Sequence, residues 1–370
     1  MHASYEIKND PVFKEFISNK ELADSTKNIY AYRLKDFSSY LDKSPSEIVG
    51  DCESCEFIKQ LSSFIEDMRS DGKSEITIQN NLDTIRTFYN THDMSLPPNS
   101  YFTVENEVEN RVLNRSNVEY ALSIINKRDK AIILLQYTSG IYPQLLRNLK
   151  YKDFINAMDD YLDIDEKDLL NIKTVINHLA KKNDLTGKWK FTKKSKEIYY
   201  TFNTTESSNA IIEYLMYRER AGKHLIDLSD PLFVNQDNMK LKKSTYDGIF
   251  NRINKKADFK LLGSNKRFFT SFNLRKSFKK ALMDSGMDKQ MIDAIFGYKS
   301  IIQWDPEDVE NILINYKRAS KYLVMDELND MECLKSKLKR NDIELKEIKK
   351  ELEYLNYLIT LNKNNSRETI

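Results

Sequence analysis

The chain has 370 residues, of which 40% are hydrophobic, and this is enough to build the cores of two modest domains. Its 58 basic and 56 acidic residues nearly cancel to a net charge of +2, so any contact with nucleic acid must depend on local clusters of charge. The sequence contains no apolar run of the roughly 18 residues that a membrane helix needs, and its start lacks the features of a signal peptide. A membrane-spanning protein is therefore excluded, and a cytoplasmic one is predicted.

Cysteine usage agrees with a reducing compartment, because the chain has only three cysteines. Cys52 and Cys55 form one CxxC pair with no second pair nearby, so we expect no zinc site. No other motif predicts a metal ion or a cofactor.

Residues 1–95 are predicted to form a helical domain, because apolar residues recur at helical spacing over 25–42, 55–72 and 74–92. Ser25 is the expected N-cap of the first of these helices, and Gly72 is expected to end the second. A four-helix bundle without a particular function would satisfy the same pattern. The outer faces offer basic side chains for phosphates, namely Lys27, Arg33, Lys35, Lys73 and Arg86.

Residues 96–112 are predicted to be an interdomain linker, because Pro97 and Pro98 prevent a helix and the polar run after them has little to bury. A second domain is then expected over 113–325, opening with helices at 116–126 and 128–139. In segment 188–203, apolar side chains alternate with polar ones on both sides of a lysine-rich turn, which predicts a hairpin with one buried face. The buried set is Trp189, Phe191, Ile198, Tyr200 and Phe202. Beyond it we expect a helix ending at Gly222, a short strand at 231–235 and a helix at 243–257.

Segment 270–300 is predicted to be a helical hairpin. Leu274, Phe278 and Leu282 form the buried face of its first helix, and its second helix is expected to stop at Gly297. The other side of the first helix carries basic residues about one turn apart, a spacing that suits phosphates. An ordinary solvated helix face explains the charges equally well. These residues are Arg275, Lys276, Lys279 and Lys280.

The order Phe272-Asn273-Leu274-Arg275, a helix, a glycine turn, a second helix and Phe296-Gly297-Tyr298 resembles the second signature box of the tyrosine recombinases. These are also called phage-type integrases, and the likeness is to archaeal ones in particular. In that family the box reads His-x-x-Arg followed by Leu-Gly-His. Arg275 thus keeps the family's arginine, whereas Phe272 and Tyr298 stand at its histidines. The resemblance covers about residues 10–325, and it implies a mainly α fold with a small β-hairpin.

Two further segments are similar to parts of the family's active site. Ser139-Gly140-Ile141-Tyr142-Pro143-Gln144 resembles the first box, and this places Tyr142 where the family has its first catalytic arginine. Arg147 lies five positions on, about 140° round a helix from Tyr142, so we expect it on another face. In the family, a lysine in the hairpin turn protonates the leaving oxygen. Lys193 matches that lysine best and Lys194 is the alternative, although a solvated lysine turn is a further interpretation.

The nucleophile of the family is a tyrosine that lies between the Gly-His pair and a helix start, which here is near Pro306. This chain has Trp304 where that tyrosine is expected. Tyr316 and Tyr322 lie beyond, on the following helix, and Tyr316 is the first candidate nucleophile. Both tyrosines pack in the core in the alternative interpretation.

Residues 326–370 are predicted to form a coiled-coil helix and tail. Met331, Leu338, Leu345, Leu352 and Ile359 recur every seven residues, with apolar companions that complete a seam interrupted by the polar Asn341. This pattern predicts a homodimer or a higher oligomer with parallel helices. The same stripe would also suit packing against the chain's own body.

The sequence predicts a DNA-binding protein of the tyrosine-recombinase fold that is deficient in strand cleavage. Of the family's usual set only Arg275 and a hairpin lysine are retained, so an architectural or regulatory role on double-stranded DNA, in association with the nucleoid, is favoured. One alternative is an active site-specific recombinase with a divergent site. Another is a coiled-coil assembly protein that does not bind DNA.

Overall fold

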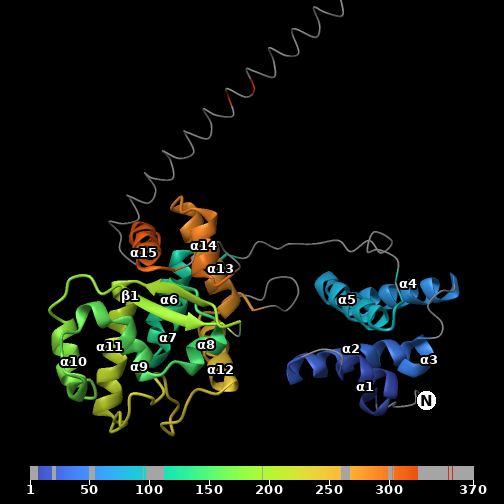
Figure 1. Cartoon of the computed structure of the whole chain (residues 1–370), viewed down its shortest axis with the longest axis horizontal. Coiled ribbons are helices and arrows are strands. Elements are labelled where there is room, and N and C mark those ends of the chain that lie inside the picture. The colour runs from blue at the N-terminus through green and yellow to red at the C-terminus, as the bar shows by residue number, and fades with distance from the viewer. Residues whose placement is uncertain are drawn as a thin grey trace, which may run out of the picture. The chain divides into compact units, whose positions relative to one another are not determined.

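The computed structural model describes residues 7–18, 22–49, 55–94, 96, 112–193, 195–259, 267–298, 302, 304–323, 349 and 352 (Figure 1). The chain divides into two units, Met1–Asn110 and Arg111–Ile370. Several sequence predictions lie outside the described residues. They concern Cys52, the interior of the predicted linker, Lys194, and the heptad stripe apart from Leu352.

The described part of the first unit is helical. Phe16 and Phe88 meet edge to face at 5.3 Å between ring centres, within a core that also takes in Phe37. The stripe Ile78, Leu82, Ile85 and Phe88 is buried, as its helical spacing indicates. The elements are η1 (Ile7–Asn9), α1 (Pro11–Ser18), α2 (Asp24–Leu41), α3 (Pro45–Val49), α4 (Cys55–Ser70) and α5 (Glu75–Thr91).

The predicted N-cap of α2 is wrong. The helix begins at Asp24, and its N-cap is Ala23, whose side chain cannot accept a hydrogen bond from the helix. Asp24 places a carboxylate in the first turn, where it favours the positive end of the helix dipole without acting as the N-cap.

The second unit is mostly helical and carries one antiparallel hairpin, so the predicted α+β fold class is confirmed. The helices that precede the hairpin are α6 (Arg115–Ser123), α7 (Lys127–Ser139), α8 (Pro143–Asn148), α9 (Tyr151–Ala157), η3 (Asp159–Tyr161), η4 (Glu166–Asp168) and α10 (Ile172–Leu179). The hairpin consists of β1 (Gly187–Thr192) and β2 (Ile198–Asn203). The helices that follow it are α11 (Thr205–Arg220), α12 (Lys243–Lys256), α13 (Ser271–Asp284), α14 (Lys289–Ile295) and α15 (Pro306–Ser320).

Helix α7 is the central element of the second unit. Every residue from Ala131 to Ser139 is buried, because α11, α13 and β2 all pack against it. A helix that is buried on all sides and mostly apolar is typical of such a position. Its polar side chains find partners inside the core; for example, the Tyr246 hydroxyl donates to Gln136 Oε1 at 2.6 Å.

The hairpin runs between helices, with α9 against β1 and with α7, α14 and α15 against β2 (Figure 1). Tyr199 and Thr201 are buried in β2, whereas Ile198 is exposed. The prediction of one buried face is therefore wrong for β2, because helices cover both of its faces. The predicted strand at 231–235 is also wrong, since this segment makes only the isolated bridges Lys150↔Pro231 and Val234↔Lys240.

The predicted helical hairpin at 270–300 is confirmed by α13 and α14. The Thr270 side chain caps α13 by accepting from the Asn273 N–H, and Leu274, Phe278 and Leu282 are buried as predicted. Gly297 follows α14 with φ of +68°, a left-handed conformation that suits glycine.

The C-terminal turn of α7 is buried, and its free carbonyl groups are satisfied by other elements. The Thr201 hydroxyl of β2 donates to the Ser139 carbonyl oxygen at 2.6 Å, and the Tyr316 hydroxyl of α15 donates to the Thr138 carbonyl oxygen at 2.7 Å. Gly140 then takes φ of +62° and redirects the chain toward Tyr142.

We expect Gly140→Ala to lower the free energy of unfolding of the second unit by about 2–5 kcal/mol. A Cβ at this position would lie 2.8 Å from Cε1 of Phe278 and closer still to Cδ1, and φ is positive. Gly222→Ala is the matched control, since φ is +73° there with nothing within 4 Å of the new Cβ, and it should cost about 1 kcal/mol. Urea unfolding followed by tryptophan fluorescence reports on this unit, because both tryptophans, Trp189 and Trp304, lie in it. Equal losses for the two variants would contradict the expectation.

Candidate functional site

Arg275 of α13 is the centre of the candidate site. Its side chain is only 9% exposed, and its Cζ lies 3.6 Å from the centre of the Tyr142 ring and 5.0 Å from that of Phe296. No carboxylate of the described residues lies within ion-pair distance of it. The two rings thus supply cation–π contacts to a guanidinium that burial has separated from water.

Backbone geometry brings the two rings to Arg275 from different segments. Tyr142 is the N-cap of α8, where Pro143 occupies the first helical position, so the turn that begins at Gly140 fixes its place. Phe296 is the C-cap of α14 and packs on Phe278 of α13, with ring centres 5.4 Å apart. The site therefore depends on how α7, α13 and α14 pack together.

Tyr142 and Tyr298 present two phenol groups beside Arg275, and about two fifths of each residue is exposed, 41% and 42%. Burial raises the pKa of Tyr142; the positive charge of Arg275 opposes this shift, and the neighbouring Tyr298 adds to it. Tyr142 is consequently neutral at neutral pH. It can donate one hydrogen bond, but it supplies no charge.

Lys193 reaches the same place from the hairpin turn. Its Nζ donates to Glu197 Oε2 at 2.9 Å and lies 3.5 Å from the Tyr298 carbonyl oxygen. The structure therefore brings Lys193 and Tyr298 together, although they are far apart in the sequence.

The basic side chains of α13 differ in their surroundings. Lys276 Nζ lies 4.9 Å from the centre of the Phe272 ring, and Phe272 is 64% exposed. Lys279 Nζ lies 5.5 Å from the Tyr298 ring and 4.0 Å from Asp293, and Lys280 pairs with Asp284 at 3.3 Å. We refer to Arg275, Tyr142, Phe272, Tyr298, Lys276 and Lys279 together as the Arg275 cluster.

Tyr199 is a neighbour of this cluster that the sequence did not predict. Burial raises its pKa to about 12, against the opposing charge of Arg275. A Cβ added at Gly297 would lie 3.0 Å from the Tyr199 ring, so glycine permits this close packing. Tyr199 was not predicted because its burial depends on helices that cover both faces of β2. The alternation of apolar and polar residues along the sequence does not reveal this cover.

The sequence predicted Arg147 on another face of the helix from Tyr142, and the structure places both residues at one cavity. Both residues line one cavity of about 620 Å³, together with Ser271 of α13. The buried Nε of Arg147 has no hydrogen-bond partner among the described residues. A second guanidinium is therefore available beside Tyr142, although it approaches from α8.

Tyr316 lies in the core. It is fully buried, its ring packs 5.4 Å from Phe202, and its hydroxyl is bonded to the Thr138 carbonyl. Burial raises its pKa well above the ordinary value. The hydroxyl of the candidate nucleophile is therefore used inside the fold rather than at the Arg275 cluster.

Trp304 occupies the segment where the resemblance expects the nucleophile. Its φ is +61°, which is rare for a bulky residue, and its ring lies 5.3 Å from that of Tyr200. The backbone N–H of Trp304 donates to the Asp308 carboxylate at 3.2 Å, close to the start of α15.

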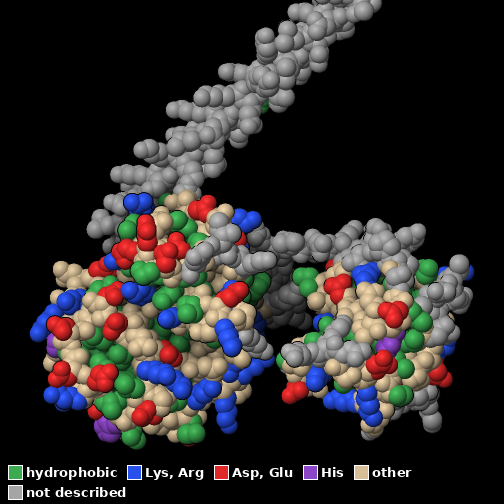
Figure 2. Space-filling view, viewed as in Figure 1, with side chains coloured by type: hydrophobic (Ala, Val, Ile, Leu, Met, Phe, Trp, Pro, Cys, Tyr) green, Lys and Arg blue, Asp and Glu red, His purple; other side chains and the backbone are tan. Residues whose placement is uncertain are grey.

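The basic residues predicted in the first unit have mixed surroundings. Arg33 joins α2 to α5 by donating to the Asn80 carbonyl oxygen and to Thr84 Oγ1, both at 3.0 Å. Arg86 lies 3.8 Å from Asp83, Lys27 is half-buried and Lys73 is exposed. On the face shown in Figure 2, basic and acidic side chains are interspersed over the described surface of both units.

Two features are absent from the described part of the chain. No helix there is both long and apolar enough to cross a membrane. No group of three or more histidine, cysteine, aspartate or glutamate side chains there is placed to hold a metal ion.

Comparisons with known proteins identify a family and several solved structures that this chain resembles. The model of the phage integrase family matches residues 107–303. A variant of the Tn1549 transposon integrase in complex with transposon right end DNA is 14% identical, over 89% of this chain and 98% of that chain, with a TM-score of 0.51. Another variant of that integrase, in complex with a circular intermediate DNA, is 16% identical over 82% and 94% of the two chains, with a TM-score of 0.50.

XerA recombinase is 18% identical over 87% of this chain and 94% of its own, with a TM-score of 0.36. No curated protein sequence matches the chain. At these identities, the two Tn1549 integrase structures show that this chain shares their fold.

Proposed function

The chain belongs to the phage integrase family, since the family model covers residues 107–303 of its 370 residues, and we propose that it binds duplex DNA without cleaving it. In this proposal it acts as an architectural or regulatory DNA-binding protein. The fold it shares with the Tn1549 integrase, whose structures contain DNA, supports the choice of partner.

The observation that carries the proposal is Arg275. A guanidinium that is 9% exposed and has no carboxylate partner in the described residues is costly to bury, and stacking on Tyr142 offsets only part of that cost. A phosphate is the complementary partner, because guanidinium and phosphate oxygens form strong charge-assisted hydrogen bonds. Lys276 and Lys279 extend the positive charge along the same helix.

Binding a phosphate and cleaving it make different demands. Cleavage adds negative charge to the non-bridging oxygens, and each missing donor typically costs about 100-fold to 1,000-fold in rate. By the resemblance, Tyr142 and Phe272 replace two such donors with one neutral hydroxyl and one ring that donates nothing. The cluster is thus suited to hold a phosphodiester and poorly suited to stabilise its transition state.

The position of the nucleophile leads to the same conclusion. Tyr316 donates to the Thr138 carbonyl inside the core, and the resemblance places Trp304 where a tyrosine is expected. A tryptophan cannot attack phosphorus. Releasing Tyr316 would leave the buried Thr138 carbonyl without its donor.

An active recombinase is the second candidate function, and one observation favours it. Tyr142 and Tyr298 both present partly exposed hydroxyl groups beside Arg275, and Lys193 lies near Tyr298. Either phenol would be a nucleophile that the family pattern does not predict. The raised pKa of Tyr142 makes it a weak one at neutral pH.

Affinity for duplex DNA is expected to fall steeply as salt is raised, because phosphate contacts release counterions. Lys276→Gln should reduce the slope of log affinity against log salt by about 1. Lys167→Gln is the control, since Lys167 is an exposed lysine paired with Asp165 and lies outside the predicted DNA contacts, and it should leave the slope unchanged. Fluorescence anisotropy with a labelled duplex measures both. Affinity that is absent, or that does not change with salt, would refute DNA binding.

No covalent protein–DNA adduct is expected on a suicide duplex whose cleaved end cannot be religated. Tyr316→Phe should instead lower the free energy of unfolding by about 1–3 kcal/mol, because the buried Thr138 carbonyl loses its donor. Denaturing gels and urea unfolding measure the two effects. An adduct that disappears in Arg275→Ala and in one of Tyr142→Phe, Tyr298→Phe or Tyr316→Phe would establish a working recombinase and identify its nucleophile.

We also propose that the C-terminal segment makes the protein a dimer or higher oligomer, on the strength of the seven-residue repeat alone. A chain ending at Asp326 should then form an oligomer of fewer copies than the full chain does, as measured by light scattering. Leu345→Asn lies in the repeat and should weaken assembly, whereas Lys346→Asn lies beside it and should not. An unchanged oligomeric state after truncation would mean that the stripe packs within one chain.

A further inference from the structure

A second cavity lies at the opposite end of α7 from Tyr142. It has a volume of about 620 Å³, within the range of small-ligand pockets, and its walls come from the N-terminus of α7, from α11 and α12, and from the segment 221–237. Asp129 and Ser139, near the two ends of α7, are ten residues apart, or about 15 Å along the helix axis. This cavity is therefore separate from the Arg275 cluster.

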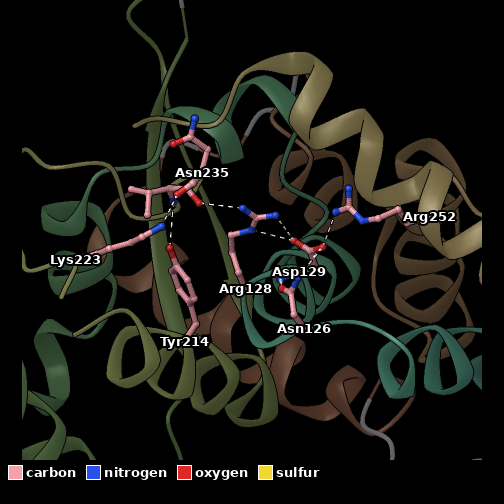
Figure 3. Close-up of polar contacts among 8 residues, drawn as sticks. Asn126, Arg128, Asp129, Tyr214, Lys223, Asn235 and Arg252 are labelled. Atoms are coloured by element: carbon pink, nitrogen blue, oxygen red, sulfur yellow. Dashed lines mark hydrogen bonds and ion pairs between the residues drawn. The ribbon is translucent and has the colours of Figure 1, made fainter. Parts of the chain in front are cut away.

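The cavity is lined by more basic than acidic side chains. Among the described residues, the basic side chains that line it are Arg128, Arg218, Lys223 and Arg252, and Asp237 is the one carboxylate. Behind the wall, the buried Asp129 binds Arg128 at 2.8 Å and Arg252 at 2.7 Å (Figure 3). The two carboxylates Asp129 and Asp237 thus lie among four basic side chains.

Lys223 and Arg218 are held in place by backbone carbonyl groups, which neutralise no charge, whereas Arg128 and Arg252 pair with Asp129. Lys223 Nζ donates to the carbonyl oxygens of Asn235 and Gln236 at 3.0 and 2.6 Å. Arg218, only 2% exposed, donates to the carbonyl oxygens of Lys223 and Pro231 at 2.9 and 2.7 Å. Figure 3 shows Lys223 and Arg128 directed toward the same segment from different sides.

Two further acids, Asp230 and Glu219, lie close enough to Arg218 to offset part of its charge. Asp230 accepts from the N–H groups of Ile226 and Asp227, and Glu219 is paired with His224 at 2.8 Å. Neither lines the cavity. The cavity lining therefore keeps an excess of basic side chains, and Asp230 and Glu219 reduce the positive charge only at Arg218.

Two tyrosines give the cavity a flat apolar component. Tyr217 lines the cavity and is 56% exposed, so a ligand can reach its ring. Tyr214 is buried and oriented by its hydroxyl, which accepts from the Val234 N–H at 3.1 Å (Figure 3).

We propose that this cavity binds a nucleoside polyphosphate. Arg252 and Lys223 contact the phosphates, since Arg252 uses only one nitrogen on Asp129 and Lys223 only two of its three donors. Arg128 and Arg218 contribute positive charge from fixed positions. The base stacks on Tyr217, as aromatic bases do on exposed rings. This binding is independent of the proposed DNA contacts at the Arg275 cluster.

Isothermal titration calorimetry of the full chain tests the proposal with two probes, ATP and inorganic triphosphate. Both should bind, and ATP more tightly because of its base. Arg252→Gln and Lys223→Gln should each weaken both ligands by about tenfold, the effect of losing one charge-assisted hydrogen bond. Tyr217→Ala should weaken ATP alone, to the affinity of triphosphate.

Arg220→Gln is the matched control, because Arg220 is an exposed cation on α11, the helix of Tyr217, and does not line the cavity. This variant should bind ATP and triphosphate as tightly as the natural chain does. Thermal unfolding of each variant verifies that it is folded. The proposal is overturned if neither probe binds at millimolar concentration, or if Arg252→Gln and Lys223→Gln bind as the control does. It is also overturned if a short duplex displaces ATP and loses affinity in the same two variants, because the site would then contact DNA phosphates.

Discussion

The second unit depends on how the C-terminus of α7 is satisfied in the core. A helix end leaves carbonyl groups without partners inside the helix, and water cannot reach these ones. Two hydroxyl groups take the place of water, one from Thr201 of β2 and one from Tyr316 of α15. Because a buried carbonyl without a donor costs about 1–3 kcal/mol, these bonds fix the hairpin and the last described helix relative to α7.

The same helix end determines where residues of the Arg275 cluster lie. Gly140 turns the chain out of α7 within one residue, with Phe278 of α13 packed against it, and Tyr142 follows two residues later. Arg275 is on the same helix as Phe278. The packing of Gly140 against Phe278 therefore sets the distance between the Arg275 guanidinium and the Tyr142 ring. The cation–π contact at 3.6 Å is thus a product of core packing and not of flexible surface side chains.

The sequence predicted the parts of the fold that depend on local spacing. The α13–α14 hairpin and the buried stripe of α5 are confirmed because a 3.6-residue period survives in the sequence. The family is confirmed by a family model that matches residues 107–303, a range that includes the segments resembling both boxes. The burial of both faces of β2 was missed, since it depends on which helices cover the hairpin. The N-cap at Ala23 could not be predicted from the sequence, because an alanine side chain accepts no hydrogen bond.

The environment of the candidate site was less predictable than its members. Arg275, Tyr142 and Phe296 lie in segments that resemble the family's boxes, but the contacts of the guanidinium with the two rings depend on how the start of α8 and the end of α14 pack. The neighbouring Tyr199 comes from β2. No spacing rule links such positions. The four cations around the second cavity likewise come from three helices and a loop, and their charges are dispersed in a sequence whose net charge is only +2.

The bond between Tyr316 and Thr138 also constrains any exchange of α15 between copies of the protein. If α15 left its place, the Thr138 carbonyl would lose its donor, and Phe202 and Phe278 would lose an aromatic neighbour. A second copy offers an identical helix with an identical tyrosine, so reciprocal domain swapping would restore every contact, whereas one-sided release would not. Closed, symmetric exchange is thus the form of C-terminal rearrangement that this core tolerates.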